Sequence, residues 1–324
     1  MKFTTTVEPA AAKFRIAHTH RLLSLGSCFA ANIGEALMQR KFDLLQQPFG
    51  TLYNPISIAT GLRRMLNAQP YRVDDLFQHH GLWRNFDHHG SYGGTDREAT
   101  LARMNGALQR AADYLRTTDR ILITLGSAFV FTDLQQNRVV ANCHQLPARR
   151  FQRRRLSVRE IENALWEPLA ALVETQPDLK VILTVSPVRH LRDGVVENQR
   201  SKAALLLAVE ELTKRSDRIH YFEAYEILLD ELRDYRFYDQ DLVHPSKMAI
   251  AVIWERFERT FCSPQTQTLS QRIEKLRQAA YHRPLHPKTE AHQLFQKKTK
   301  VAIEELQQEY PYLNLSEELT MLSN

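Results

Sequence analysis

The 324-residue sequence has little of several features that mark specialised classes of protein. Its three cysteines, Cys28, Cys143 and Cys262, lie far apart and form neither a CxxC pair nor a disulfide framework. Eleven glycines and 13 prolines are too few for a fibrous or low-complexity chain. No stretch reaches the roughly 18 apolar residues of a membrane helix, and the start lacks the apolar core of a secretory signal. We therefore expect a cytoplasmic protein with no membrane partner.

The charge balance is only mildly basic. Lys and Arg number 43 against 37 Asp and Glu, a formal net charge of +6, which does not by itself indicate nucleic-acid binding. Five arginines cluster in seven positions: Arg149, Arg150, Arg153, Arg154 and Arg155. Phe151 is the only aromatic residue among them, so a solvated helix entry or an anion-binding rim is favoured over a nucleic-acid surface. We expect no nucleic-acid partner.

Motifs for metals and cofactors are also absent. The sequence has no phosphate-binding GxxxxGK[ST] loop, no GxGxxG and no HExxH, so we expect no cofactor and no metal. His88 and His89 are adjacent, as are His79 and His80, and adjacent side chains do not easily share one metal ion. The stretch 83–94 is rich in aromatic residues, His and Gly, which favours a mobile lid or substrate-binding loop. His88 and His89 are candidates to reach a substrate from it.

Apolar runs that alternate with helical patterns are present instead. Short, nearly continuous apolar runs predict strands at Arg21–Gly26, Arg120–Leu125, Lys180–Val185 and Arg218–Phe222. Apolar residues at helical spacing predict helices at Cys28–Arg40, Leu101–Leu115, Val158–Glu174, Gln199–Arg215 and Ser246–Phe261. This alternation predicts an α/β fold for residues 1–262, a three-layer α/β/α sandwich with a mainly parallel sheet.

The composition changes near Pro264. Leu269–His282 and Thr289–Glu309 are charged, amphipathic and free of glycine, so residues 263–324 are predicted to form a helical extension. These helices pack either on the sandwich or on another subunit, and packing on the chain's own core is favoured. A homo-oligomer formed through the C-terminal helices is the corresponding partner expectation.

The carboxyl ends of the strands are where ligands bind in such a sheet. Ser27 lies where the first strand turns into the first helix, beside the free N–H groups of the helix start, which can stabilise an oxyanion. Taken alone, a helix cap is the more common role for such a serine. Arg189 and His190 follow the third strand, where they can meet an anionic group or form a polar network that fixes the loops.

Asp241 and His244, three residues apart, precede the last helix of the sandwich. The histidine can take a proton from Ser27 while the carboxylate orients the imidazole. Cys28 is a second candidate nucleophile, because a thiolate at a helix N-terminus has a lowered pKa. Consecutive side chains point in different directions, so only one of the two can face the histidine. A buried packing role is favoured for Cys28.

Residues Gly26–Ala30 read GSCFA. Further stretches match the motifs of one known family in the same order along the chain: 32–35, 48–56, 125–130, 142–144, 184–190 and 241–246. On these motifs, residues 22–261 resemble the GSCFA family within the broad SGNH/GDSL-type hydrolases. The resemblance implies a flavodoxin-like sandwich with a Ser27 nucleophile and an Asp241/His244 dyad. It also implies oxyanion donors at the N–H groups of Ser27 and Gly50.

SGNH enzymes share several short sequence motifs, called blocks, and this chain departs from the pattern at the third of them. SGNH enzymes read GxND there, whereas no asparagine follows Gly126 in this chain. Ser127, Asn54 and Asn142 are the candidates to replace the missing amide, and the sequence does not choose among them.

Two functions follow as hypotheses. The first is an SGNH-type serine esterase or acyl hydrolase, or an acyltransferase, that acts on a small-molecule or carbohydrate ester of polar character. The second is a non-catalytic ligand-binding or scaffold protein with a degenerate oxyanion hole and a partner-binding helical tail.

Overall fold

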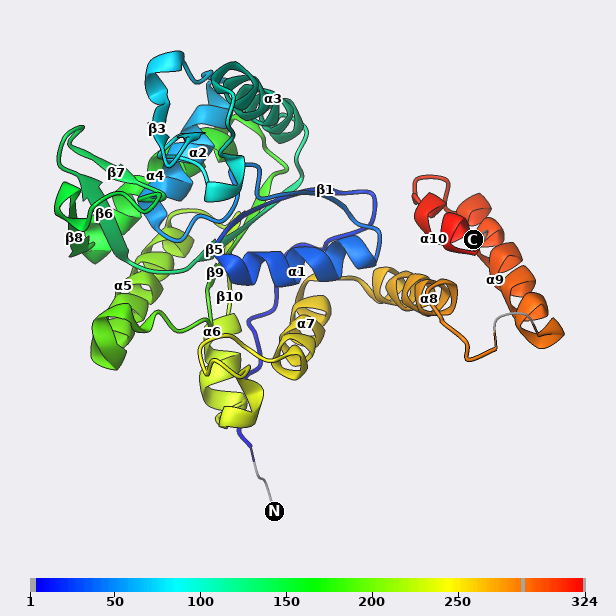
Figure 1. Cartoon of the computed structure of the whole chain (residues 1–324). Coiled ribbons are helices and arrows are strands. Elements are labelled where there is room, and N and C mark those ends of the chain that lie inside the picture. The colour runs from blue at the N-terminus through cyan, green and yellow to red at the C-terminus, as the bar shows by residue number, and fades with distance from the viewer. Residues whose placement is uncertain (1–3, 287–288, 323–324) are drawn as a thin grey trace.

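The computed structural model of the chain describes residues 4–286 and 289–322. A five-stranded sheet forms its centre, with strand order β10-β9-β5-β1-β2 and every neighbouring pair parallel (Figure 1). The strands are β1 (Arg21–Gly26), β2 (Asp43–Gln46), β5 (Arg120–Leu125), β9 (Lys180–Val185) and β10 (Ile219–Phe222). The predicted α/β sandwich is therefore confirmed. Residues 1–3 of the first predicted part and residues 287–288 and 323–324 of the second lie outside the described residues.

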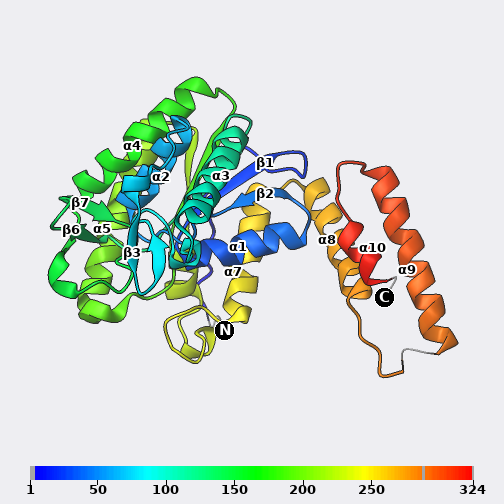
Figure 2. The ribbon, with the colours of Figure 1, turned by 45° about the horizontal axis from the view of Figure 1, so that its top comes forward.

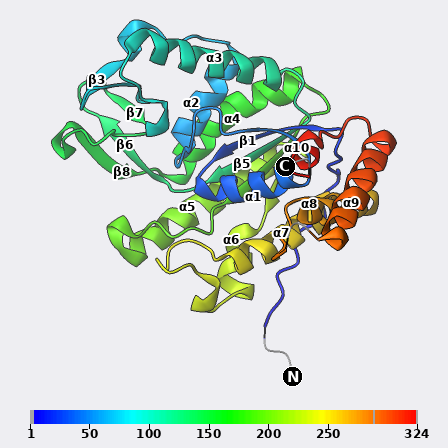
Figure 3. The same ribbon diagram turned by 45° about the vertical axis from the view of Figure 1, so that its right-hand side comes forward.

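Helices cover both faces of the sheet, because its apolar runs are buried on both sides. One face carries α1 (Cys28–Gln39) and α7 (Lys247–Phe261), which share an apolar core with Leu22 of β1. The other face packs against α2 (Pro55–Leu66), α3 (Arg97–Leu115), α4 (Val158–Thr175) and α5 (Gly194–Arg215). Figure 3 shows α2, α3 and α4 on one side of the sheet and α1 and α7 on the other.

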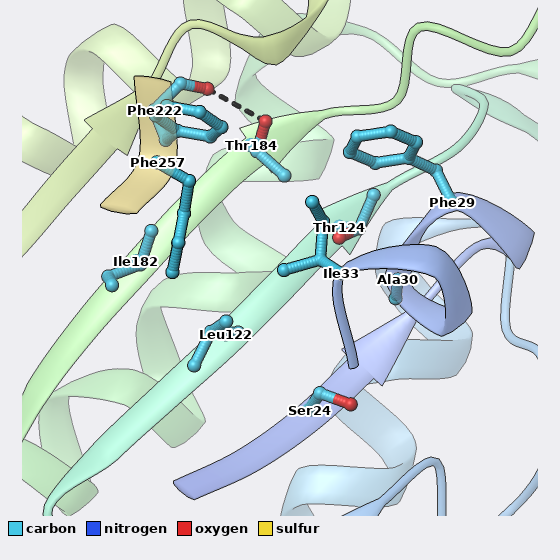
Figure 4. Close-up of a pocket in the computed structure, with 10 residues that line it drawn as sticks. All are labelled: Ser24, Phe29, Ala30, Ile33, Leu122, Thr124, Ile182, Thr184, Phe222 and Phe257. Atoms are coloured by element: carbon cyan, nitrogen blue, oxygen red, sulfur yellow. Dashed lines mark hydrogen bonds between the residues drawn. The ribbon is translucent and has the colours of Figure 1, made fainter. Parts of the chain in front are cut away.

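The interface between α1 and the sheet is tightly packed. Phe29 and Ile33 of α1 face a cavity of only about 20 Å³, lined also by Leu122, Ile182 and Phe257 (Figure 4). That volume has room for about one water molecule. The interface therefore fixes the start of α1 against the sheet and leaves no space for a ligand between them.

Three further strands and a hairpin stand outside the main sheet. β6 (Phe129–Asp133), β7 (Arg138–Val140) and β8 (Phe151–Arg155) form an antiparallel sheet, and β3 (Phe77–His79) pairs with β4 (Leu82–Arg84). Short helical turns occupy Val73–Asp75, Gly90–Tyr92, Ala148–Arg150, Leu191–Asp193, Ala224–Glu226, Ile227–Glu231 and Tyr235–Phe237. The arginine cluster thus lies mostly on strand β8 rather than at a helix entry.

The C-terminal residues form a separate helical unit beside the far end of α1 (Figures 1 and 2). Its helices α8 (Pro264–Ala280), α9 (Glu290–Glu309) and α10 (Ser316–Met321) enclose an apolar core of their own. The ammonium of Lys41, two residues after α1, lies 2.7 Å from the buried carboxylate of Glu318. The predicted helical extension is confirmed, whereas a homo-oligomer built through it stays a prediction.

Within the described part of the chain, none of the helices has the length and apolar character needed to cross a bilayer.

Candidate active site

The site lies at the carboxyl ends of β1 and β5, where the strand order reverses. β2 lies on one side of β1 and β5 on the other, which makes the crevice between β1 and β5 the expected ligand position in an open α/β sheet. Gly26 ends β1 with φ = 132°, and a Cβ there would approach the carbonyl oxygen of Thr124 to 2.1 Å. Only glycine fits this turn, which brings the chain directly from β1 into α1.

Ser27 is enclosed by this turn. Its side chain is fully buried, its hydroxyl has no hydrogen-bond partner, and a Cβ on Gly126 would lie 3.0 Å from its own Cβ. It occupies the N-cap position of α1 without forming a side-chain cap bond. Among the described residues no hydrogen bond joins Ser27 to His244, and Ser27 is not one of the residues that line the cavity beside the His244 loop.

Cys28, the next residue, is the one that meets the histidine. Its Sγ lies 3.6 Å from Nε2 of His244, and Nδ1 of the same imidazole lies 2.6 Å from Oδ2 of Asp241. The predicted pairing of Asp241 with His244 is thus present in the structure. The side chain that contacts the imidazole at Nε2 is the thiol of Cys28.

A tight turn fixes the carboxylate against the imidazole. The other oxygen of Asp241, Oδ1, accepts from the N–H groups of Val243 and His244 at 2.9 and 3.0 Å. Leu242, which lies between Asp241 and Val243, has φ = 56°, a left-handed conformation that is costly for a branched side chain. The loop is held by Arg189, whose N–H donates to Val243 O and whose guanidinium donates to Leu242 O, both at 3.1 Å.

The surroundings of the Cys28 thiol and of the Asp241 carboxylate shift their pKa values in opposite directions. Burial raises the pKa of the Cys28 thiol, opposed by the first amides of α1 and the charge of Lys202. The thiol is therefore protonated at neutral pH and needs a base to ionise it. The pKa of Asp241 is lowered to about 2 by its hydrogen bonds with the backbone N–H of His244, with the imidazole of His244 and with the backbone N–H of Val243. The carboxylate is therefore charged at any pH near neutrality and keeps the imidazole oriented.

A cavity of about 460 Å³ opens beside the loop of His244. Four predicted site residues line it: Asn54, Ser127, Arg189 and His190. Oδ1 of Asn54 accepts from the N–H of Ser57 at 2.8 Å, so its Nδ2 is the amide atom left to donate. Burial, then the charge of Lys202, lowers the pKa of His190 to about 3, which keeps that imidazole neutral.

Other predicted site residues lie elsewhere. His88 is fully buried among aromatic rings, 4.8 Å from Tyr71 and 4.7 Å from Tyr92 between ring centres, and burial lowers its pKa to about 3. Residues 83–94 are therefore not an open lid, since their centre, residues 85–88, is packed in the core. Asn142 closes a turn by accepting from the N–H of His144 at 2.7 Å.

The two backbone donors implied for the oxyanion hole are occupied. The N–H of Ser27 donates to Thr124 O at 3.0 Å, and the N–H of Gly50 donates to Gln47 O at 2.8 Å. A Cβ on Gly50 would lie 2.3 Å from Cβ of His89, so the glycine permits close packing of the loop that carries His89. The imidazole of His89 contacts the hydroxyl of Ser91 at 3.0 Å and does not line the cavity.

Lys202 is a functional candidate that the sequence analysis did not single out. It is buried in α5, and its ammonium donates to Gly126 O at 2.8 Å and to Ser186 O at 2.6 Å, at the ends of β5 and β9. Burial lowers its pKa to about 7. The signal in the sequence is the polar run Asn198, Ser201 and Lys202 on the otherwise apolar stripe of this helix.

The pH dependence of stability is expected to reveal this lysine. An unfolded lysine keeps its proton to about pH 10, so between about pH 7 and pH 10 the unfolded state binds more protons and stability rises with pH. Relative to Lys202→Met, the unfolding free energy of the wild type is expected to rise by on the order of 2 kcal/mol over two pH units. Urea unfolding at both pH values measures this difference. Lys214→Met, on the exposed side of the same helix, serves as the control, and equal pH slopes for all three proteins would contradict the buried charge.

Groups of three or more His, Cys, Asp or Glu side chains that could hold a metal ion do not occur among residues 4–286 and 289–322.

The fold and the site together define a three-layer α/β protein with a thiol, an imidazole and a carboxylate in series at the carboxyl edge of its parallel sheet. The chain belongs to the GSCFA family, which matches residues 21–257, and residues 273–324 match the C-terminal domain of GSCFA domain proteins. No curated protein matches the chain.

The chain is also distantly similar to several solved structures. A carbohydrate esterase family 3 protein from Talaromyces cellulolyticus is 10% identical with a TM-score of 0.36, covering 78% of this chain and 99% of its own. A mutant acetyl esterase with acetate ion is 10% identical with a TM-score of 0.37, covering 80% and 100%. The acetyl xylan esterase Est2A from Butyrivibrio proteoclasticus is 12% identical with a TM-score of 0.31, covering 63% and 55%. Similarity this distant leaves the chemistry to be argued from the site itself.

Proposed function

We propose that this protein is a thiol-dependent acyl hydrolase that cleaves carboxylic esters or thioesters with Cys28 as nucleophile. The observation that carries the proposal is the series of contacts from Sγ of Cys28 to Nε2 of His244, and from Nδ1 of that imidazole to Asp241. A nucleophile beside a base that a third group orients is the usual arrangement for covalent catalysis.

In the acylation step, Nε2 of His244 accepts the thiol proton as Sγ attacks the carbonyl carbon of the substrate. Nδ1–H donates to Asp241, which leaves the lone pair of Nε2 free for this proton. The tetrahedral intermediate then collapses. The bond from the carbonyl carbon to the leaving oxygen or sulfur breaks, and the leaving group takes the proton from Nε2.

In the second step, water attacks the thioester formed on Cys28. It gives a proton to Nε2 of His244 as its oxygen bonds to the carbonyl carbon. The bond from that carbon to Sγ breaks, the carboxylic acid leaves, and Sγ recovers the proton. A hydroxyl group in place of water gives acyl transfer by the same steps.

The oxyanion needs donors other than the two implied by the sequence, because the N–H groups of Ser27 and Gly50 are already bonded to carbonyls. The N–H of Cys28 at the start of α1 and Nδ2 of Asn54 are the donors that this proposal assigns. Asn54 lines the cavity beside His244, and its bond to Ser57 fixes the amide before a substrate arrives. It is favoured over Asn142, which does not line the cavity, and over Ser127, whose hydroxyl contacts Ser201 and accepts from the N–H of Phe129.

Trapping the acyl-enzyme tests the proposal. The protein is mixed with 4-nitrophenyl acetate, quenched in acid within the first turnovers, and its peptides are analysed by mass spectrometry. One acetyl group is expected on Cys28, and neutral hydroxylamine is expected to remove it because thioesters are labile to this reagent. An acetyl group on Ser27 that resists neutral hydroxylamine would instead identify an oxygen ester and overturn the proposal.

A further inference from the structure

The cavity of about 460 Å³ beside the candidate active site carries an excess of positive charge. Arg153, Arg189 and Arg192 line it, and no carboxylate does. Val243, the residue before His244, and Tyr53 belong to the same wall. Tyr53 is close enough to Cys28 for the charge of the thiolate to raise the pKa of the phenol, after the larger effect of burial. The cavity therefore adjoins the loop of His244 through Val243 and Arg189.

Asp193 is the carboxylate nearest to these arginines, and its pKa is lowered first by its hydrogen bonds with Arg153 and then by the charges of Arg153 and Arg192. Arg153 is paired with Asp193, its Nε lying 2.9 and 3.1 Å from the two carboxylate oxygens. Arg189 donates to the carbonyl of Leu242, a neutral acceptor. Among the contacts of the described residues, Arg192 has neither a hydrogen bond nor an ion pair at short range, and its guanidinium lies 5.1 Å from the ring centre of Phe131.

The guanidinium groups of Arg153 and Arg192 both lie against the ring of Phe131. The guanidinium of Arg153 lies 4.7 Å from the centre of Phe131 and that of Arg192 lies 5.1 Å from it. Like charges in a partly enclosed space repel each other more strongly than they do in open water. An anion bound in the cavity that both arginines line reduces this repulsion and gains charge-assisted hydrogen bonds from them.

The rest of the wall is apolar. Phe129, Phe131 and Val140 line the cavity together with the neutral imidazole of His190. A ligand that fills this space therefore has an apolar or planar part against the rings and an anionic group at the arginines.

From this arrangement we propose that the cavity binds the anionic part of the acyl substrate, which is an ester or thioester carrying a phosphate or carboxylate group. The inference rests on the proposed function, since it deepens the specificity of the same site. The anion reaches Arg153 and Arg192 either from the acyl chain or from the leaving group. Both sources share one recognition chemistry, and a matched set of substrates distinguishes them.

The test compares three thioesters in wild type and Arg192→Gln. The acetyl thioester of N-acetylcysteamine is neutral. The glutaryl thioester of N-acetylcysteamine is anionic on the acyl side, and the acetyl thioester of phosphopantetheine is anionic on the thiol side. For an anionic substrate that uses the cavity, KM is expected to rise about 10-fold to 100-fold in Arg192→Gln, with kcat and the neutral substrate little changed. Arg192→Lys is expected to restore part of the affinity.

Arg116→Gln is the matched control, because it makes the same change of charge away from the cavity. Arg116 is largely exposed at the end of α3. An equal rise in KM for neutral and anionic substrates, or no change with either anionic substrate, overturns the proposal.

Binding without turnover separates this proposal from the proposed function. Calorimetry measures the affinity of Cys28→Ala for free phosphopantetheine and for glutarate, with and without Arg192→Gln. If the wild type hydrolyses no substrate but Arg192→Gln weakens binding about 10-fold or more, the anion site stands and the hydrolase fails. If neither ligand binds, or if Arg192→Gln leaves both affinities unchanged, the anion site fails whatever the activity.

Discussion

Replacing Cys28 with alanine is expected to lower the turnover of 4-nitrophenyl acetate by roughly 10⁴-fold or more, the scale on which removal of an active-site nucleophile acts. The side chain is half-buried at the start of α1, where Sγ contacts His244 and the residue packs against the edge of the apolar core. Loss of one sulfur atom there is expected to leave the thermal unfolding midpoint nearly unchanged. Turnover and unfolding are measured on the same preparation.

Two variants make this result specific. Ser27→Ala is expected to keep its activity, because the Ser27 hydroxyl is buried, has no partner and makes no cap bond. Cys143→Ala removes another half-buried thiol without touching the dyad. Loss of turnover in Ser27→Ala with activity retained in Cys28→Ala would reverse the assignment and restore the serine mechanism.

Replacing Asp241 with asparagine is expected to lower kcat by roughly 10³-fold to 10⁴-fold, as is typical when the group that orients a catalytic imidazole loses its charge. Asparagine is similar in shape and keeps an acceptor for the N–H groups of Val243 and His244. It no longer stabilises the imidazolium that forms when Nε2 takes the proton, and its amide can select the wrong tautomer. Steady-state kinetics at neutral pH measure the loss.

The same loop supplies the control. Asp239 is exposed two residues earlier, and its carboxylate accepts from the N–H of Gln240 rather than from the imidazole. Asp239→Asn is expected to retain near wild-type kcat. The double variant Asp241→Asn/His244→Ala is expected to be little worse than His244→Ala alone, because the two residues act as one unit. Additive losses would indicate that Asp241 acts on something other than His244.

The central fold is predictable from the sequence because its strands are continuous apolar runs. β1, β5 and β9 begin and end at the residues predicted for them, since full burial on both faces of a parallel sheet selects such runs. β2 was not predicted, because it has only four residues and none of them is fully buried. β8 was not predicted either, because its arginines obscure the alternation of a strand.

The contact between Asp241 and His244 was predictable from the sequence, which names Ser27 and Cys28 as the two candidates to face the imidazole. These two residues lie together at the strand-to-helix turn, where consecutive side chains point in different directions, so only one is expected to face the histidine. Which one does depends on the φ angle of Gly26 and on the bond from the N–H of Ser27 to Thr124, neither of which has a sequence signature. Lys202 was missed because one lysine on a long amphipathic helix looks like a solvated charge.

The left-handed backbone of Leu242 has a consequence for how the site comes into existence. Asp241 and His244 are near neighbours in the chain, yet the turn that joins them opposes the intrinsic preference of a leucine, by about 1 kcal/mol or more. The two bonds from Arg189, which follows β9, hold that turn in place. A peptide cut from this loop is therefore expected to sample other shapes, so the pairing of acid and imidazole is assembled only when distant parts of the chain have already found each other.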